Sequence, residues 1–160
     1  MPGHSRVWVY QANRMFTIAE RNHLNTELEE LCNQWSTHGT PLLASFTLQF
    51  DQFVVMAVDA QHQGASGCSI DGSVHFLKSL QKSLGLDFFD RTMVAFLMDQ
   101  KVVQHGLSGL KTLFENKALT ADTISFNNTV ITKDAWEKGW QVPVENSWLA
   151  RYLPKSAVTH

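Results

Sequence analysis

The chain has 160 residues, of which 44% are hydrophobic and 18% are charged, and its formal net charge is −2. This length and composition suit one folded domain with its own core, and they exclude an intrinsically disordered chain. The 13 basic residues are scattered along the sequence and form no run. The chain therefore lacks the basic stripe typical of a nucleic-acid-binding protein.

The N-terminal part predicts a strand followed by an amphipathic helix. Arg6–Gln11 is rich in β-forming residues and alternates in polarity, which predicts the strand. Thr17 and Glu20 have the spacing of a capping box, so the helix is expected to begin there and to end near Gly39. Its apolar stripe consists of Leu24, Leu28, Leu31 and Trp35.

A β-hairpin is expected next. Ala44–Phe50 alternates between apolar and polar residues, as a half-exposed strand does. Asp51 and Gln52 form the expected two-residue turn. Phe53–Asp59 is apolar at nearly every position, which predicts a strand covered on both faces.

The middle of the chain predicts a second helix and a second hairpin. Helical periodicity extends over Ser69–Leu84, and Gly85 is placed to end that helix. Thr92–Met98 is another continuously apolar strand. Asp99 and Gln100 are expected to turn the chain into a strand over Lys101–His105.

The last third predicts short elements. Ser108 is expected to cap a short helix, and Thr132 to cap a final helix that Gly139 ends. Thr123–Phe126 and Thr129–Ile131 are short strand candidates.

These elements together predict an α+β fold. We expect a single globular domain over residues 1–160, with a mixed or mostly antiparallel sheet of about five to six strands and helices mainly on one face. The aromatic-rich C-terminal segment, residues 140–160, is expected to pack back on this domain, because aromatic area left in water is costly.

The segment 59–76, DAQHQGASGCSIDGSVHF, is the strongest candidate for a functional site. Its glycines allow a ligand to approach the backbone closely, and a helix N-terminus attracts anions. Hydroxyl groups could add hydrogen bonds to the ligand. The candidate ligand-binding residues are Gly64, Ser66, Gly67, Ser69 and Ser73, with Arg91 as a further cation. The alternative is a strand-to-helix turn that Ser69 or Asp71 caps.

Cysteine chemistry is a second possibility for this segment. Cys68 is expected beside the helix start, where the dipole lowers the pKa of a thiol. His62 and His75 are candidate bases, and Asp71 could orient His75 because the two are four residues apart. In the alternative interpretation Cys68 is a buried packing residue, and Asp71 and His75 belong to a solvated face.

No metal site is predicted, because the Asp and His residues of this segment match no zinc spacing. No cofactor can be predicted from the sequence. Cys32 and Cys68 form no CxxC pair, no apolar run is long enough to cross a membrane, and no signal-peptide core follows Met1. We therefore expect a cytoplasmic protein with reduced thiols and no membrane insertion.

Several stretches spread over most of the chain resemble a family of small uncharacterised bacterial proteins, whose members often carry the label "ABC transporter ATPase". These stretches are GASGCSID at 64–71, SVHF at 73–76, WVYQANR at 8–14, FDR at 89–91, TISFNN at 123–128, and Pro143 with Ser147-Trp148.

The sequence argues against the activity in that label. An ATP-binding cassette needs GxxxxGK[ST], whose lysine and hydroxyl group reach the phosphates and Mg²⁺. The glycine-bearing run GASGCSIDGS contains no lysine, and LSGL at 107–110 is too short to match the cassette signature LSGGQ.

Two functional hypotheses follow. In the first, the domain binds or transforms a small anionic ligand at Gly64–His75. In the second, it is a non-catalytic module that binds a protein partner or a second copy of itself. An exposed apolar patch without a site near Cys68 would favour the second.

Overall fold

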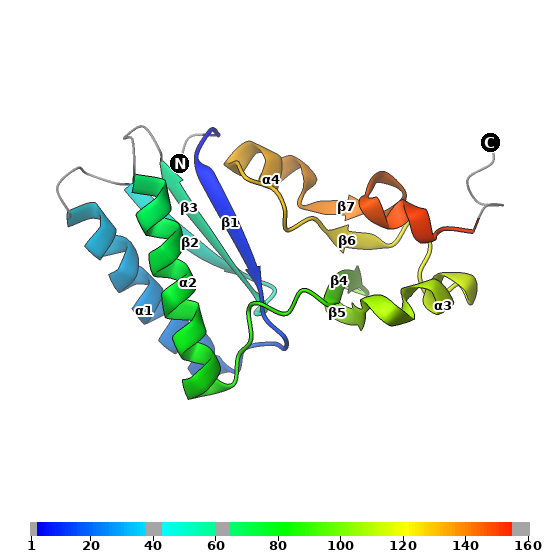
Figure 1. The fold of residues 1–160 in the computed structure, drawn as a ribbon, viewed down its shortest axis with the longest axis horizontal. Helices are drawn as coiled ribbons and strands as arrows, with labels where there is room; N and C mark the ends of the chain where they lie inside the picture. Colours follow the sequence, from blue (N-terminus) through cyan, green and yellow to red (C-terminus); the bar gives the residue numbers. More distant parts are fainter. Residues whose placement is uncertain (1–2, 38–42, 60–64, 155–160) are drawn as a thin grey trace. The chain divides into compact units, whose positions relative to one another are not determined.

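The computed structural model describes residues 3–37, 43–59 and 65–154, which form an α+β fold (Figure 1). The fold class predicted from the sequence is confirmed, and every strand pair is antiparallel. The strands form two sheets, one of three and one of four strands, in place of one sheet.

The chain divides into two compact units, which we describe separately. The first unit comprises Met1–Asp90 and Asn128–Glu137, and the second comprises Arg91–Asn127 and Lys138–His160. The expectation of one domain over residues 1–160 stays a prediction.

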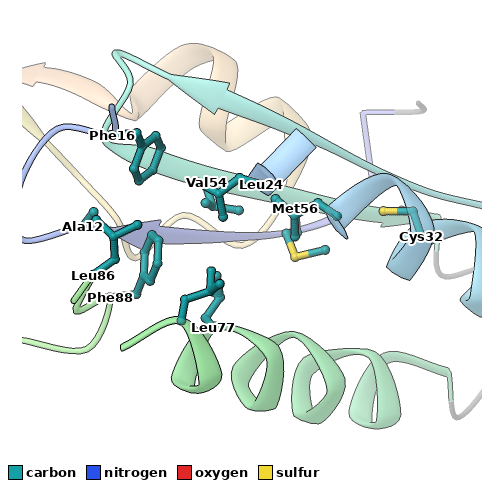
Figure 2. Packing of buried hydrophobic residues seen from close by; sticks show 11 residues of the cluster. Ala12, Phe16, Leu24, Cys32, Val54, Met56, Leu77, Leu86 and Phe88 are labelled. Carbon is teal, nitrogen blue, oxygen red and sulfur yellow. The ribbon is translucent and has the colours of Figure 1, made fainter. Parts of the chain in front are cut away.

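The sheet of the first unit has the order β1-β3-β2, with β1 at Arg6–Gln11, β2 at Leu43–Gln49 and β3 at Phe53–Asp59. Helices α1 (Ile18–Thr37) and α2 (Ala65–Leu84) pack on one face of this sheet. Figure 2 shows Leu77 of α2 facing Val54 and Met56 of β3.

Strand β3 is buried on both faces, as its continuous apolar sequence predicted. Val54 and Met56 face the helices, and Phe53 and Val55 project from the opposite face. All four side chains are at most 3% exposed. This central strand therefore anchors the first unit.

The capping box at the start of α1 is confirmed. The N–H of Glu20 donates to Thr17 Oγ1 at 3.1 Å, and the N–H of Thr17 donates to Glu20 Oε1 at 2.8 Å. Arg14 makes a bidentate ion pair with the same carboxylate at 2.8 Å for each bond. One of its nitrogens also donates to the carbonyl of Leu84 at 2.8 Å, which links the start of α1 to the end of α2.

The turn between β2 and β3 lies one residue earlier than predicted. Phe50 and Asp51 take the two positive φ angles, 53° and 50°, and the N–H of Gln52 donates to the carbonyl of Gln49. Gln52 is fixed elsewhere, because its carbonyl accepts from the N–H of Ala12 and its side-chain amide donates to the carbonyl of Ala12. The second turn is as predicted, with positive φ at Asp99 and Gln100.

The predicted strand at Thr129–Ile131 is wrong. The carbonyl of Ile131 accepts from the N–H of Val7, and Thr132 makes an isolated bridge with Arg6, so the pairing is too short for a strand. Thr132 does cap α4 (Lys133–Gly139), because its hydroxyl accepts from the N–H of Ala135 at 3.1 Å.

The sheet of the second unit has the order β5-β4-β6-β7. Its strands are β4 at Met93–Met98, β5 at Lys101–Gly106, β6 at Ile124–Phe126 and β7 at Gln141–Pro143. A short 3₁₀ turn leads into α3 (Leu110–Glu115). The expected cap by Ser108 is wrong, because Gly109 precedes α3 and no side chain caps it.

The aromatic C-terminal segment contributes to the core of the second unit. Trp140 packs against Phe126 with ring centroids 4.9 Å apart, and Tyr152 stacks on Phe114. Trp148 is an exception, with 52% of its surface exposed. The buried core residues of this unit are Phe96, Leu110, Phe114, Leu119, Val144 and Leu149.

Candidate functional site

Helix α2 begins at Ala65, four residues earlier than the predicted start at Ser69. Ser66, Gly67 and Cys68 therefore belong to its first turn and do not precede it in a loop. His62 and Gly64 lie outside the described residues, and the side chains of residues 65–71 are likewise not described.

The earlier start changes the geometry of the proposed cysteine site. Cys68, Asp71 and His75 now belong to one continuous helix, at spacings of three and four residues along the chain. Seven residues of helix separate the backbones of Cys68 and His75 by about 10 Å along the axis. The hypothesis that Cys68, Asp71 and His75 act together stays a prediction, because the side chains of Cys68 and Asp71 are not described.

Two later residues of the segment face in different directions. Ser73 is fully buried, and its hydroxyl group shares a 2.8 Å hydrogen bond with the Tyr10 hydroxyl group of β1. Burial raises the pKa of Tyr10, and the hydrogen bond with Ser73 opposes this effect. His75 is exposed. Ser73 thus joins α2 to the sheet.

Arg6 of β1 is a candidate that the sequence-based interpretation missed. Trp8 and Tyr10 pack toward the helices, so strand alternation places Arg6 on the same face of the sheet. Its Nε is buried, and no described residue accepts a hydrogen bond from it. A buried donor without an acceptor is rare in folded proteins, and each case calls for an explanation.

Arg6 lies level with the start of α2. The two elements run side by side in the same direction, and the Tyr10–Ser73 hydrogen bond joins them (Figure 1). From Tyr10 back to Arg6, the four residues of β1 span about 13 Å. The same distance along α2 corresponds to about nine helical residues. About nine residues before Ser73, the chain reaches the start of the helix at Ala65. The positive end of α2 and the Arg6 guanidinium therefore lie at the same end of the first unit.

Asp59, the last residue of β3, lies close to His4. His4 Nε2 lies 3.5 Å from Asp59 Oδ1, and the His4 side chain is 61% exposed. Alternation places Asp59 on the face of the sheet opposite Arg6. Within the described part of the chain, no three His, Cys, Asp or Glu side chains gather closely enough to hold a metal ion.

Arg91, the last predicted ligand-binding residue, and the second cysteine, Cys32, have different environments. Arg91 is exposed and belongs to the second unit. Cys32 lies on α1 in the core of the first unit (Figure 2), and burial raises the pKa of its thiol to about 11. Cys32 is therefore a protonated packing residue at neutral pH.

No protein-family model matches the chain, and neither a curated protein nor a solved structure is significantly similar to it. Among the described helices, none combines the length and hydropathy needed to cross a membrane.

Proposed function

We propose that the protein binds a small anionic ligand, with a phosphate or carboxylate group, at the start of α2. The observation that carries the proposal is the buried Nε of Arg6, for which no described residue provides an acceptor. An anionic ligand that contacts the Arg6 guanidinium would balance its charge.

The helix itself supports the same ligand chemistry. Helix α2 has 20 residues, and its first turn contains no acidic residue, so no carboxylate of that turn offsets the partial positive charge of the helix N-terminus. Asp71 is the seventh residue of α2, about 9 Å along the axis from Ala65. Asp71 therefore lies beyond the first turn, to which the dipole effect is confined.

The proposed contacts are Arg6 and the first-turn residues Ser66 and Gly67, with Gly64 and Ser69 flanking them. Ser73 is left out because its hydroxyl group is buried against Tyr10.

Enzymatic use of the site would rest on Cys68, whose place in the first turn favours a thiolate. ATP hydrolysis is not proposed, because the site has no lysine of a phosphate-binding loop.

The test is a calorimetric titration with inorganic phosphate, sulfate and citrate. We expect wild-type protein to bind at least one of these anions, and Arg6→Gln to weaken binding by about 10-fold to 100-fold, the range for a lost charge-assisted hydrogen bond. Arg21→Gln is the matched control. It removes the same charge from a side chain that is 43% exposed and pairs with Asp51, so affinity should be unchanged.

Unfolding of the ligand-free proteins separates a binding role of Arg6 from a structural one. A ligand-binding Arg6 leaves the free energy of unfolding of Arg6→Gln equal to that of wild type or higher, because a buried donor without an acceptor is removed. The proposal is wrong if no anion binds at about 10 mM, a concentration that detects even millimolar affinity. Equal binding by Arg6→Gln and wild type would also refute it.

We further propose a cytoplasmic location. Cys32 is a free thiol, and Cys68 is the only other cysteine in the sequence. Reduced cysteines are usual in that compartment.

A further inference from the structure

Among the described residues, β2 shows none of the usual features that protect the outer edge of a sheet. Strand β2 is an edge of its sheet, is seven residues long and has the sequence LASFTLQ, with no charge and no proline. No described strand pairs with its outer side. Proteins usually protect such edges with charges, prolines, bulges or very short strands, because free N–H and C=O groups attract other strands.

The other sheet edges of the described chain do carry protection. The outer side of β1 meets Ile131 and Thr132. In the second unit, β5 begins with the exposed Lys101, and β7 has three residues and ends at Pro143. The missing protection is therefore particular to β2.

The sequence of β2 is complementary to itself. In an antiparallel pair centred on Phe46, each Phe46 faces its copy, Ala44 faces Leu48, and Ser45 faces Thr47. Apolar side chains thus meet on the helix-covered face, where Ala44, Phe46 and Leu48 are only partly buried within one chain. Hydroxyl groups meet on the opposite face, and no like charges face each other.

From this complementarity we propose that the protein forms a two-fold symmetric homodimer through antiparallel pairing of β2 with β2 of a second copy. The two three-stranded sheets become one six-stranded sheet. Assembly stops at two copies, because each β2 is used once and the contacts of β1 with Ile131 and Thr132 interrupt the far edge. The proposal does not depend on the anion site, which lies at β1 and α2.

Sedimentation velocity with two charge variants tests this interface. We expect wild-type protein to be dimeric at about 0.1 mM, within the range for a modest interface. Ser45→Lys/Thr47→Lys places lysines opposite each other at both cross-strand pairs and should weaken the dimer about 10-fold or more. Ser45→Lys/Thr47→Glu places a lysine opposite a glutamate at both pairs and should dimerise within a few-fold of wild type.

Crosslinking keeps the proposal testable if the double-lysine variant fails to fold. In Ser45→Cys/Thr47→Cys, oxidation should give a covalent dimer in which position 45 of one chain is joined to position 47 of the other, as mass spectrometry can establish. A wild-type monomer at about 0.1 mM, a larger oligomer, or a folded double-lysine variant that remains a dimer overturns the proposal. Intermolecular disulfides that join only other positions also overturn it.

Discussion

The ion pair between Arg14 and Glu20 predicts a specific loss of stability in acid. Arg14 donates to both carboxylate oxygens of Glu20 and also to the carbonyl of Leu84, so this one carboxylate helps to fix the start of α1 against the end of α2. The hydrogen bonds from Arg14 are the main cause that lowers the pKa of Glu20 from 4.5 to about 2, against the opposing effect of burial.

The direction of the pH effect follows from this lowered pKa. A carboxyl group with a lower pKa in the folded state contributes stability above its unfolded pKa and loses it as the pH falls. The contribution of Glu20 is therefore complete above about pH 4.5 and disappears towards pH 2. A pKa difference of this size corresponds to about 3 kcal/mol. Because the Arg14 side chain is 41% exposed, water screens the pair, and we expect about 1–2 kcal/mol.

The assay is urea unfolding of wild-type protein and Glu20→Gln between pH 7 and pH 2. Glutamine can still accept the hydrogen bond from the N–H of Thr17, so the variant removes the charge and keeps the cap. The difference in the free energy of unfolding should be about 1–2 kcal/mol at neutral pH and should shrink towards zero near pH 2. Glu29→Gln, on the exposed side of α1, is the control and should follow wild type. A Glu20→Gln difference that is absent at pH 7, or that stays constant with pH, would refute the reasoning.

Two further predictions concern α2. Labelling of Cys68 by iodoacetamide should have a pH midpoint below about 8.5, the ordinary value for a thiol. Cys32 should react only on unfolding, because burial raises its pKa to about 11, and equal protection of Cys68 would contradict thiolate chemistry at the site. Gly85→Ala should lower the free energy of unfolding by about 1–2 kcal/mol, measured in urea, because Gly85 has a φ of 69°. An added Cβ there meets no atom within 4 Å, so a larger loss would contradict a purely backbone origin.

The sequence predicted helix ends correctly where a nearby side chain accepts a hydrogen bond from a backbone N–H group, or where a glycine takes a positive φ. Thr17 and Thr132 cap helices because their hydroxyl groups accept nearby N–H groups, and Gly85 ends α2 because its φ is positive. Such interactions reach over a few residues, so spacing alone predicts them.

Predictions that depended on distant partners were less accurate. Thr129–Ile131 has a β-forming composition, but its pairing with β1 is limited to the hydrogen bond from Val7 to Ile131 and the adjacent bridge between Arg6 and Thr132. The division of the strands into two sheets is likewise set by long-range pairing, such as that of β1 with β3. Composition describes how well a strand fits a sheet, and tertiary contacts decide which sheet it joins.

The start of α2 illustrates why the candidate site itself was only half predictable. Gly64 and Gly67 suggested a loop, because glycine in a helix costs about 1 kcal/mol relative to alanine. A 20-residue helix whose Leu77 and Leu80 are almost fully buried offsets this cost, and the helix therefore includes Gly67.

The proposed role of Arg6 also depends on the packing of α2 against the sheet. Alternation in RVWVYQ already places its side chain on the face of Trp8 and Tyr10. Its position level with the first turn of α2, however, follows from the hydrogen bond between Tyr10 and Ser73, which are 63 residues apart in the sequence. Because this contact helps to hold α2 against β1, replacing Tyr10 or Ser73 should weaken the proposed anion binding without either residue touching the ligand.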